Sequence, residues 1–178
     1  MSAIETLQNV VHALETSEIP YMVSGSIALG CYTVMRTTRG IDIVVELQET
    51  DIQDFLSGFD EAEYYHYEPA IRDEVRRRGM FNLISQITGF KIDFIVRKAS
   101  DYAKVAFSRR RICEEFGVRI WVISLEDPII AKLDWIQDYQ SDRQIEDIQA
   151  LLENKDLDRS YMLQWIDSLK LKTFGLNI

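Results

Sequence analysis

Two aspartates in this sequence lie inside strongly apolar stretches. Asp42 belongs to the run GIDIVV at residues 40–45, and Asp93 belongs to the run KIDFIV at residues 91–96. Runs rich in isoleucine, valine and phenylalanine predict buried β-strands, and a carboxylate kept in such a strand costs free energy unless it is paired. Two strands that carry the same costly group indicate a purpose beyond packing.

A Gly-Ser pair precedes the first of these runs. Gly25 and Ser26 lie between a predicted strand at residues 21–24 and a predicted short helix at residues 27–34. Backbone N–H groups and a hydroxyl at such a turn can bind a phosphate group, and glycine permits its close approach. Because a Gly-Ser pair alone is most often only a turn, its interpretation depends on Asp42 nearby.

The elements that must position these residues follow from hydrophobic periodicity. We expect Thr50 to be the N-cap of one helix, and the acidic, tyrosine-rich segment 58–69 to be either a loop or a partly ordered lid. The other elements predicted for the first two thirds are helices at 2–16, 51–57, 72–78 and 101–106, a strand at 41–47, and hairpins at 80–87 with 90–96 and at 112–116 with 118–123.

The last third changes character and predicts helices only. Ser124 is the expected N-cap of the first helix, with Asp127 in the capping-box position and Pro128 in the first turn. Further helices are predicted at residues 143–152 and 160–169. The fold class is therefore α+β, a small mixed sheet flanked by helices. We expect an α/β core at residues 1–123 and a C-terminal helical cap, packed on that core, at residues 124–178.

Composition bounds the function. The 178 residues carry a formal net charge of -9, so no overall field attracts nucleic acid. Cys31 and Cys113 fit no ligand spacing, and we expect them to be reduced, as in a cytoplasmic protein. The N-terminal segment has acidic residues and no long apolar run, so we expect neither a signal peptide nor a membrane span.

Several short motifs occur in a characteristic order. These are V-S-G-S at 23–26, R-T-T-R-G-I-D-I-V-V at 36–45, K-I-D-F-I-V at 91–96, S-L-E-D-P-I-I-A-K-L at 124–133 and R-Q-I-E-D-I at 143–148. Together they resemble the nucleotidyltransferase superfamily with the DNA polymerase beta-like fold, over roughly residues 1–153. The last two motifs resemble the branch that contains AbiEii-type toxins and related small bacterial nucleotidyltransferases.

The resemblance implies a function and a set of site residues. The activity would be metal-dependent transfer of a nucleoside monophosphate from an NTP to an RNA or protein hydroxyl, with Mg²⁺, or alternatively Mn²⁺, as the cofactor and a toxin–antitoxin partner. Such transfer needs positioning and charge stabilisation more than covalent help from the protein. The implied residues are Asp42 and Asp93 as catalytic metal ligands, Gly25, Ser26, Arg36, Thr38 and Lys132 for the nucleotide, and Asp147 in support of Lys132.

The sequence departs from the family pattern at one position. Where the family has Asp-x-Asp, this chain has Gly40-Ile41-Asp42, so the first carboxylate is missing. Positions 40 and 42 share a strand face about 6.6 Å apart, whereas Glu46 lies about 13 Å from Asp42, too far for a two-metal site of about 4 Å. The alternative hypothesis is therefore a catalytically impaired pseudoenzyme with a nucleotide-binding, regulatory or antitoxin role.

Other interpretations remain open. The aspartates could be paired for structural reasons, Lys132 could be a solvated lysine, and Asp147 could pair with Arg143 one helical turn earlier. The arginine runs at 76–78 and 109–111 are either solvated charges or RNA contacts. In a third hypothesis the chain is an interaction module that docks a partner through residues 58–69. The sequence does not specify an oligomeric state.

Overall fold

The computed structural model describes residues 2–34, 38, 40–114, 117–139 and 141–178. Its helices are α1 (Ala3–Thr16), α2 (Gly25–Leu29), the 3₁₀ turn η1 (Glu49–Asp51), α3 (Ile52–Ser57), α4 (Glu68–Arg76), α5 (Asp101–Ser108), α6 (Glu126–Ile136), α7 (Asp142–Leu152) and α8 (Arg159–Ser168). Its strands are β1 (Tyr21–Ser24), β2 (Gly40–Val45), β3 (Tyr64–Tyr65), β4 (Met80–Ser85), β5 (Lys91–Val96), β6 (Arg111–Cys113) and β7 (Ile120–Val122).

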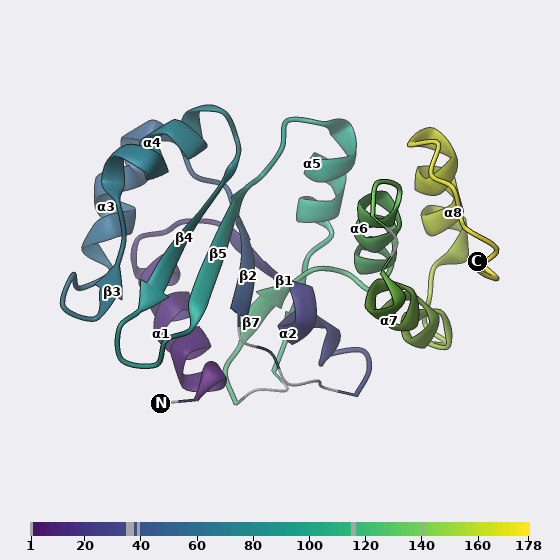
Figure 1. Cartoon of the computed structure of the whole chain (residues 1–178), viewed down its shortest axis with the longest axis horizontal. Coiled ribbons are helices and arrows are strands. Elements are labelled where there is room, and N and C mark those ends of the chain that lie inside the picture. Colours follow the sequence, from purple (N-terminus) through teal and green to yellow (C-terminus); the bar gives the residue numbers. More distant parts are fainter. Residues whose placement is uncertain (1, 35–37, 39, 115–116, 140) are drawn as a thin grey trace.

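The strands form one mixed sheet in the order β3-β4-β5-β2-β1-β7-β6. The pairs β2–β5 and β1–β7 are parallel, and the other neighbours are antiparallel. Figure 1 shows α6, α7 and α8 grouped at one end of the molecule, beside α2, while α3 and α4 lie at the other end, beside β3 and β4. The predicted α+β class, with a mixed sheet and flanking helices, is confirmed.

The two faces of the central strands differ in what covers them. On β2 the side chains of Ile41 and Ile43 are fully buried, and on β5 those of Ile92 and Phe94 are as well. The ring of Phe55 from α3 lies 5.0 Å from that of Phe94, edge to face, so this helix closes the apolar face. Because strand side chains alternate, the residues between these apolar ones face the opposite side.

Helix starts show both agreement and correction. Ser2 and Glu5 form a reciprocal capping box at the start of α1, where the periodicity predicts a helix. The prediction for Thr50 is wrong, because this residue lies within η1. The prediction for Ser124 is wrong too, since α6 begins at Glu126 and the Ser124 hydroxyl donates to the carbonyl of Arg109.

The segment 58–69 is more ordered than a loop. It contains the edge strand β3, which pairs antiparallel with β4 through Tyr64 and Tyr65, and it ends in the first turn of α4. Tyr64 is buried, whereas Tyr65 remains 61% exposed. The sheet therefore holds the middle of this segment in place.

Buried apolar side chains gather in two clusters. The first joins α1, α3 and the sheet, and the second joins α6, α7 and α8. Leu29 of α2 belongs to the second cluster, although its neighbour Ala28 belongs to the first. The short helix α2 thus contacts both bodies of apolar side chains and fixes the C-terminal helices against the sheet.

The prediction of reduced cysteines is wrong. Cys31 and Cys113 form a disulfide with their Cα atoms 6.5 Å apart, within the range that a disulfide requires. They are separated by 82 positions in the sequence, so their proximity is a product of the fold and not of local spacing. The cysteine argument for a cytoplasmic location therefore fails.

No helix in the described part of the chain is both long enough and apolar enough to span a membrane.

Candidate functional site

The two strand aspartates are direct neighbours. Asp42 of β2 and Asp93 of β5 are register partners in the parallel pair, so their Cα atoms lie on adjacent strands about 4.8 Å apart. Both occupy the face opposite the isoleucine and phenylalanine core. Asp93 is 8% exposed, and its Oδ1 atom is buried without a hydrogen-bond partner. Two carboxylates side by side, one with an unsatisfied oxygen, make this the candidate site for chemistry.

The electrostatics of Asp42 reflect this arrangement. Burial raises the pKa of its carboxyl above the ordinary value, and the negative charge of Asp93 raises it further. The positive charges of Lys91 and Lys132 act in the opposite direction and lower the pKa of Asp42. Burial and Asp93 together outweigh the two lysines, so a cation placed beside the carboxylate pair would favour the charged form of Asp42.

Gly25 lies directly against Asp42. Its φ is +59°, and a Cβ added there would lie 1.9 Å from Oδ2 of Asp42. Only glycine satisfies both the left-handed backbone and the close approach. Since α2 has five residues, the contribution of this turn rests on open backbone and the Ser26 hydroxyl, not on a long helix dipole.

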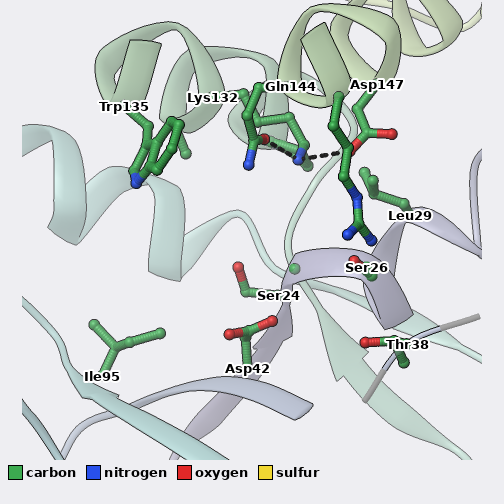
Figure 2. Close-up of a pocket in the computed structure, with 14 residues that line it drawn as sticks. Ser24, Ser26, Leu29, Thr38, Asp42, Ile95, Lys132, Trp135, Gln144 and Asp147 are labelled. Atoms are coloured by element: carbon green, nitrogen blue, oxygen red, sulfur yellow. Dashed lines mark hydrogen bonds and ion pairs between the residues drawn. The ribbon is translucent and has the colours of Figure 1, made fainter. Parts of the chain in front are cut away.

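A cavity of about 630 Å³ opens above Asp42. Figure 2 shows Asp42, Ser24 and Ile95 along one wall, and Trp135, Lys132 and Gln144 along the opposite wall. The first wall belongs to β1, β2 and β5, and the second to α6 and α7. The cavity is therefore a cleft between the sheet and the C-terminal helices. Its other lining residues are Gly25, Ser26, Leu29, Thr38, Pro128, Ala131, Arg143 and Asp147.

Lys132 is held over this cavity by α7. Its Nζ donates to Oε1 of Gln144 at 2.6 Å and to Oδ2 of Asp147 at 3.0 Å, as drawn in Figure 2. Asp147 is 6% exposed. The sequence left open that Lys132 is a solvated lysine. The structure differs, because the ammonium of Lys132 is fixed in a largely buried position. Asp147, for which the sequence favoured a local pair with Arg143, contacts a residue of another helix.

The remaining predicted nucleotide residues are placed in part. Thr38 lines the cavity, and its hydroxyl donates to the carbonyl of Gly40 at 2.9 Å. Ser26 lines the cavity beside Gly25. Arg36 lies outside the described residues. Of the predicted site, Asp42, Gly25, Ser26, Thr38, Lys132 and Asp147 all border the same cavity, whereas Asp93 does not line it and adjoins it only as the register partner of Asp42.

Nothing in the backbone explains the glycine at position 40. The φ of Gly40 is outside the left-handed region, and an added Cβ would meet only the carbonyl of Lys91 at 3.5 Å, an ordinary contact. A Cβ therefore fits here. Glu46, the other acid on this face, is already engaged, because its carboxylate pairs with Arg97 and lies 3.7 Å from Arg78. It is no substitute for a carboxylate at position 40.

The donor set fits a single hard cation. Among the described residues no group of three His, Cys, Asp or Glu side chains is arranged to hold a metal. Mg²⁺, however, is commonly bound by one or two carboxylates together with substrate phosphates and waters. Asp42 and Asp93, with the unsatisfied Oδ1 of Asp93, meet that lower requirement.

Sequence reasoning missed four residues of this site. Ser24 is the antiparallel partner of Asp42, and Lys91 forms an ion pair with Asp93. Both could have been found from the sequence. Ser24 lies two positions before Ser26, and Lys91 lies two positions before Asp93 on the same strand. Trp135 and Gln144 lie on the helical wall. Gln144 shares a helix face with Asp147, whereas nothing in the sequence indicated that Trp135 faces the sheet.

The two arginine runs are occupied within the chain. Arg76 pairs with Glu49 at 3.0 Å, and Arg77 pairs with Glu74. Arg109 pairs with Glu126 at 2.8 Å, and Arg111 lies over the ring of Tyr32. Since each of these four charges already has a carboxylate or an aromatic ring of this chain beside it, an RNA phosphate would have to compete with that partner.

Comparison with known proteins places the fold. No protein-family model and no curated protein matches the sequence. Among solved structures, the lincosamide antibiotic adenylyltransferase LnuA with lincomycin bound is 16% identical, with a TM-score of 0.54, over 84% of this chain and 96% of that one. A protein of Thermotoga maritima described as a nucleotidyltransferase is also 16% identical, with a TM-score of 0.52, over 93% and 92% of the two chains. ANT(2'')-Ia in complex with adenylyl-2''-tobramycin is 11% identical, with a TM-score of 0.51, over 96% and 95%.

The chain therefore has the nucleotidyltransferase fold. At these identities the likeness concerns architecture, and the residues of the site must support any statement about chemistry. The superfamily expected from the motifs agrees with this fold, whereas the AbiEii branch stays a prediction.

Proposed function

We propose that this chain binds a nucleoside triphosphate in the cleft between the sheet and α6–α7, and transfers its nucleoside monophosphate to an acceptor hydroxyl. One observation carries the proposal: Asp42 lies at the base of a cleft, in register with Asp93 on the next strand, and the opposite wall of the cleft presents the fixed ammonium of Lys132. Anionic phosphates between a carboxylate-bound cation and a lysine would have partners on both sides.

Each wall has a defined task in this proposal. Gly25 and Ser26 would leave room for and hydrogen-bond the triphosphate, while Lys132 would hold it from the helical side. The indole of Trp135 is 52% exposed and lines the cleft, so it offers a flat surface on which a nucleobase can stack. The cleft would thus have a polar end for phosphate and an aromatic end for the base.

The chemistry follows from these positions. The acceptor oxygen attacks the α-phosphorus, the bond from that phosphorus to the β-phosphate bridging oxygen breaks, and pyrophosphate leaves. Mg²⁺, or Mn²⁺, held by Asp42 and Asp93, would neutralise the phosphate charge. Asp93 is the carboxylate that we assign to accept the proton of the hydroxyl. Lys132 would orient the departing phosphates.

The acceptor is the part that the site specifies least. The resemblance suggested an RNA or protein hydroxyl, and the solved neighbours have lincomycin and adenylyl-2''-tobramycin bound. Because the arginine runs are engaged with carboxylates and aromatic rings of this chain, we favour a compact acceptor over an RNA strand. The toxin–antitoxin partner and the cytoplasmic location stay predictions.

Calorimetric titration tests the binding step. ATP, CTP, GTP and UTP would each be titrated into the full chain with and without Mg²⁺, and we expect Mg²⁺-dependent binding of at least one. Lys132→Ala should weaken that binding by at least ~10-fold, because it removes a fixed phosphate contact. Lys104→Ala is the matched control, since Lys104 has an exposed ion pair with Asp101 away from the cleft. Absence of binding for all four nucleotides would refute the proposal.

A pseudoenzyme is the second candidate, and the glycine at position 40 favours it. Nucleotide binding would persist on Asp42, Asp93 and Lys132, while turnover would be lost with the missing carboxylate. Incubation with radiolabelled NTP and a panel of hydroxyl acceptors separates the two hypotheses. Pyrophosphate release by the native chain supports the enzyme. Release only from Gly40→Asp supports the pseudoenzyme.

A further inference from the structure

A lysine lies beside the carboxylate pair and beside position 40, where the third acid of the family pattern is missing. Lys91 begins β5 and is the register partner of Gly40 in the parallel pair β2–β5. Its Nζ lies 2.8 Å from Oδ2 of Asp93, and the Lys91 side chain is 50% exposed. Beside the position where the family has an aspartate, this chain therefore has an ammonium group.

The ammonium acts on both carboxylates. It contacts Asp93 directly, and its charge is the first of the influences that lower the pKa of Asp42. With two carboxylates and one ammonium, the centre has a net charge of about one negative unit at neutral pH. An aspartate at position 40 without this lysine would give a centre with three negative charges. The local charge is thus too small to attract two divalent ions.

We infer that Lys91 is the resident cation of this site, and that a divalent ion must displace its ammonium from Asp93 in order to bind. The inference rests on the proposed function and concerns the same carboxylate pair. In the chain alone the ammonium satisfies Oδ2 of Asp93, which leaves only the buried Oδ1 without a partner. Once the triphosphate arrives, the exposed Lys91 can turn from Asp93 to the phosphate oxygens, which releases the carboxylate for one metal ion.

Two consequences distinguish Lys91 from a structural ion pair. The divalent ion should bind weakly without nucleotide, and each bound nucleotide should bring one ion and not two. A lysine that only stabilised the fold would influence the melting temperature but not the affinity for a metal ion.

Titration with Mn²⁺ alone, followed by electron paramagnetic resonance, tests the inference. The signal of free Mn²⁺ disappears when the ion binds, and no nucleotide is present. Lys91→Met keeps the length of the stem and removes the charge, so we expect it to bind Mn²⁺ at least ~10-fold more tightly than the wild type, as expected when a like charge within about 4–6 Å is removed. Lys91→Arg keeps the charge and should bind as the wild type does.

The controls make every outcome decisive. Lys104→Met removes the same charge from an exposed ion pair elsewhere and should leave Mn²⁺ affinity unchanged. Lys91→Gln repeats the test if the methionine variant does not fold. Equal affinity in wild type, Lys91→Met and Lys91→Gln would overturn the inference, including the case in which none binds the ion. An equal gain in Lys104→Met would overturn it as well.

The proposed function is tested separately. If the Lys91 variants gain Mn²⁺ affinity and no NTP binds to the wild type, the inference holds and the proposed function fails. If an NTP binds with Mg²⁺ and the Lys91 variants show no gain, the proposed function holds and the inference fails.

Discussion

Two regions of this molecule hold partly or fully buried carboxylates, and they do so differently. Asp42 lies at the base of an open cleft with Asp93 beside it on the next strand, and Lys91 and Lys132 supply positive charge near Asp42. Asp127 lies at the junction of α5, α6 and α8, is fully buried, and accepts hydrogen bonds from the phenols of Tyr102 and Tyr161 at 3.2 and 2.8 Å.

The contrast separates a candidate site for chemistry from a carboxylate that holds helices together. Burial raises the pKa of Asp127 to about 6, although its hydroxyl donors and the Arg109 charge act against this. The two phenols tie α5 and α8 to α6 through this carboxylate. The strand pair has an adjoining cleft and a displaceable lysine instead of enclosing donors. A costly carboxylate is therefore functional evidence only when something outside the chain can reach it.

The largest expected effect is on nucleotide binding. Asp42→Asn removes a ligand of the proposed ion and should weaken Mg²⁺-dependent NTP binding by at least ~100-fold. Because burial disfavours the charged form of the Asp42 carboxyl, removal of this charge should leave the melting temperature unchanged or raise it. Calorimetry and thermal melting check the two parts. Asp101→Asn, on an exposed acid, is the control, and equal losses in both variants would contradict the assignment.

The pH dependence of stability should show the opposite character of Asp127. Its pKa is raised from 3.8 to about 6, so the folded state holds a proton that the unfolded state has lost between about pH 4 and 6. The contribution of Asp127 to the free energy of unfolding should therefore be largest below about pH 4 and fall by about 3 kcal/mol as the pH rises through 6. Urea unfolding of wild type and Asp127→Asn across this range isolates the effect, and identical slopes would refute it.

Gly25→Ala should damage the strand site through shape alone. The new Cβ would clash with Oδ2 of Asp42 at a φ of +59°, so we expect a loss of about 1–3 kcal/mol in stability and at least ~10-fold in NTP affinity. Gly89→Ala is a matched control, because its φ is +71° and an added Cβ meets nothing within 4 Å. It should show the backbone strain without the loss of binding.

Gly40→Asp should produce the smallest change of these variants, and it tests the charge of the strand site most directly. A Cβ at position 40 makes only an ordinary contact, and a third carboxylate should raise Mn²⁺ affinity by about three- to tenfold, in part by attracting the Lys91 ammonium away from Asp93. Gly40→Asn, of equal size and without charge, should leave the affinity unchanged. A similar gain in both variants would attribute the effect to packing.

Sequence reasoning singled out residues of the sheet-side wall of the cleft and some of its helical wall. The periodicity of the strands and the order of the motifs placed Asp42, Asp93, Gly25 and Ser26, because strand alternation is a local property. The hairpin between β4 and β5 was predicted correctly for the same reason. Ser124 was expected to cap α6, but its hydroxyl contacts Arg109 across the fold, which a local pattern cannot reveal.

The sequence by itself determined the fold class, the two strand carboxylates, the glycine that adjoins them and the absence of an acid at position 40. Only the tertiary structure decided that Cys31 and Cys113 are bonded, that Lys132 is fixed by Asp147 over the cleft, and that Lys91 neutralises Asp93. The physical reason is distance in space: local backbone preferences follow from neighbouring residues, whereas charge pairs and disulfides depend on which strands and helices the fold brings together.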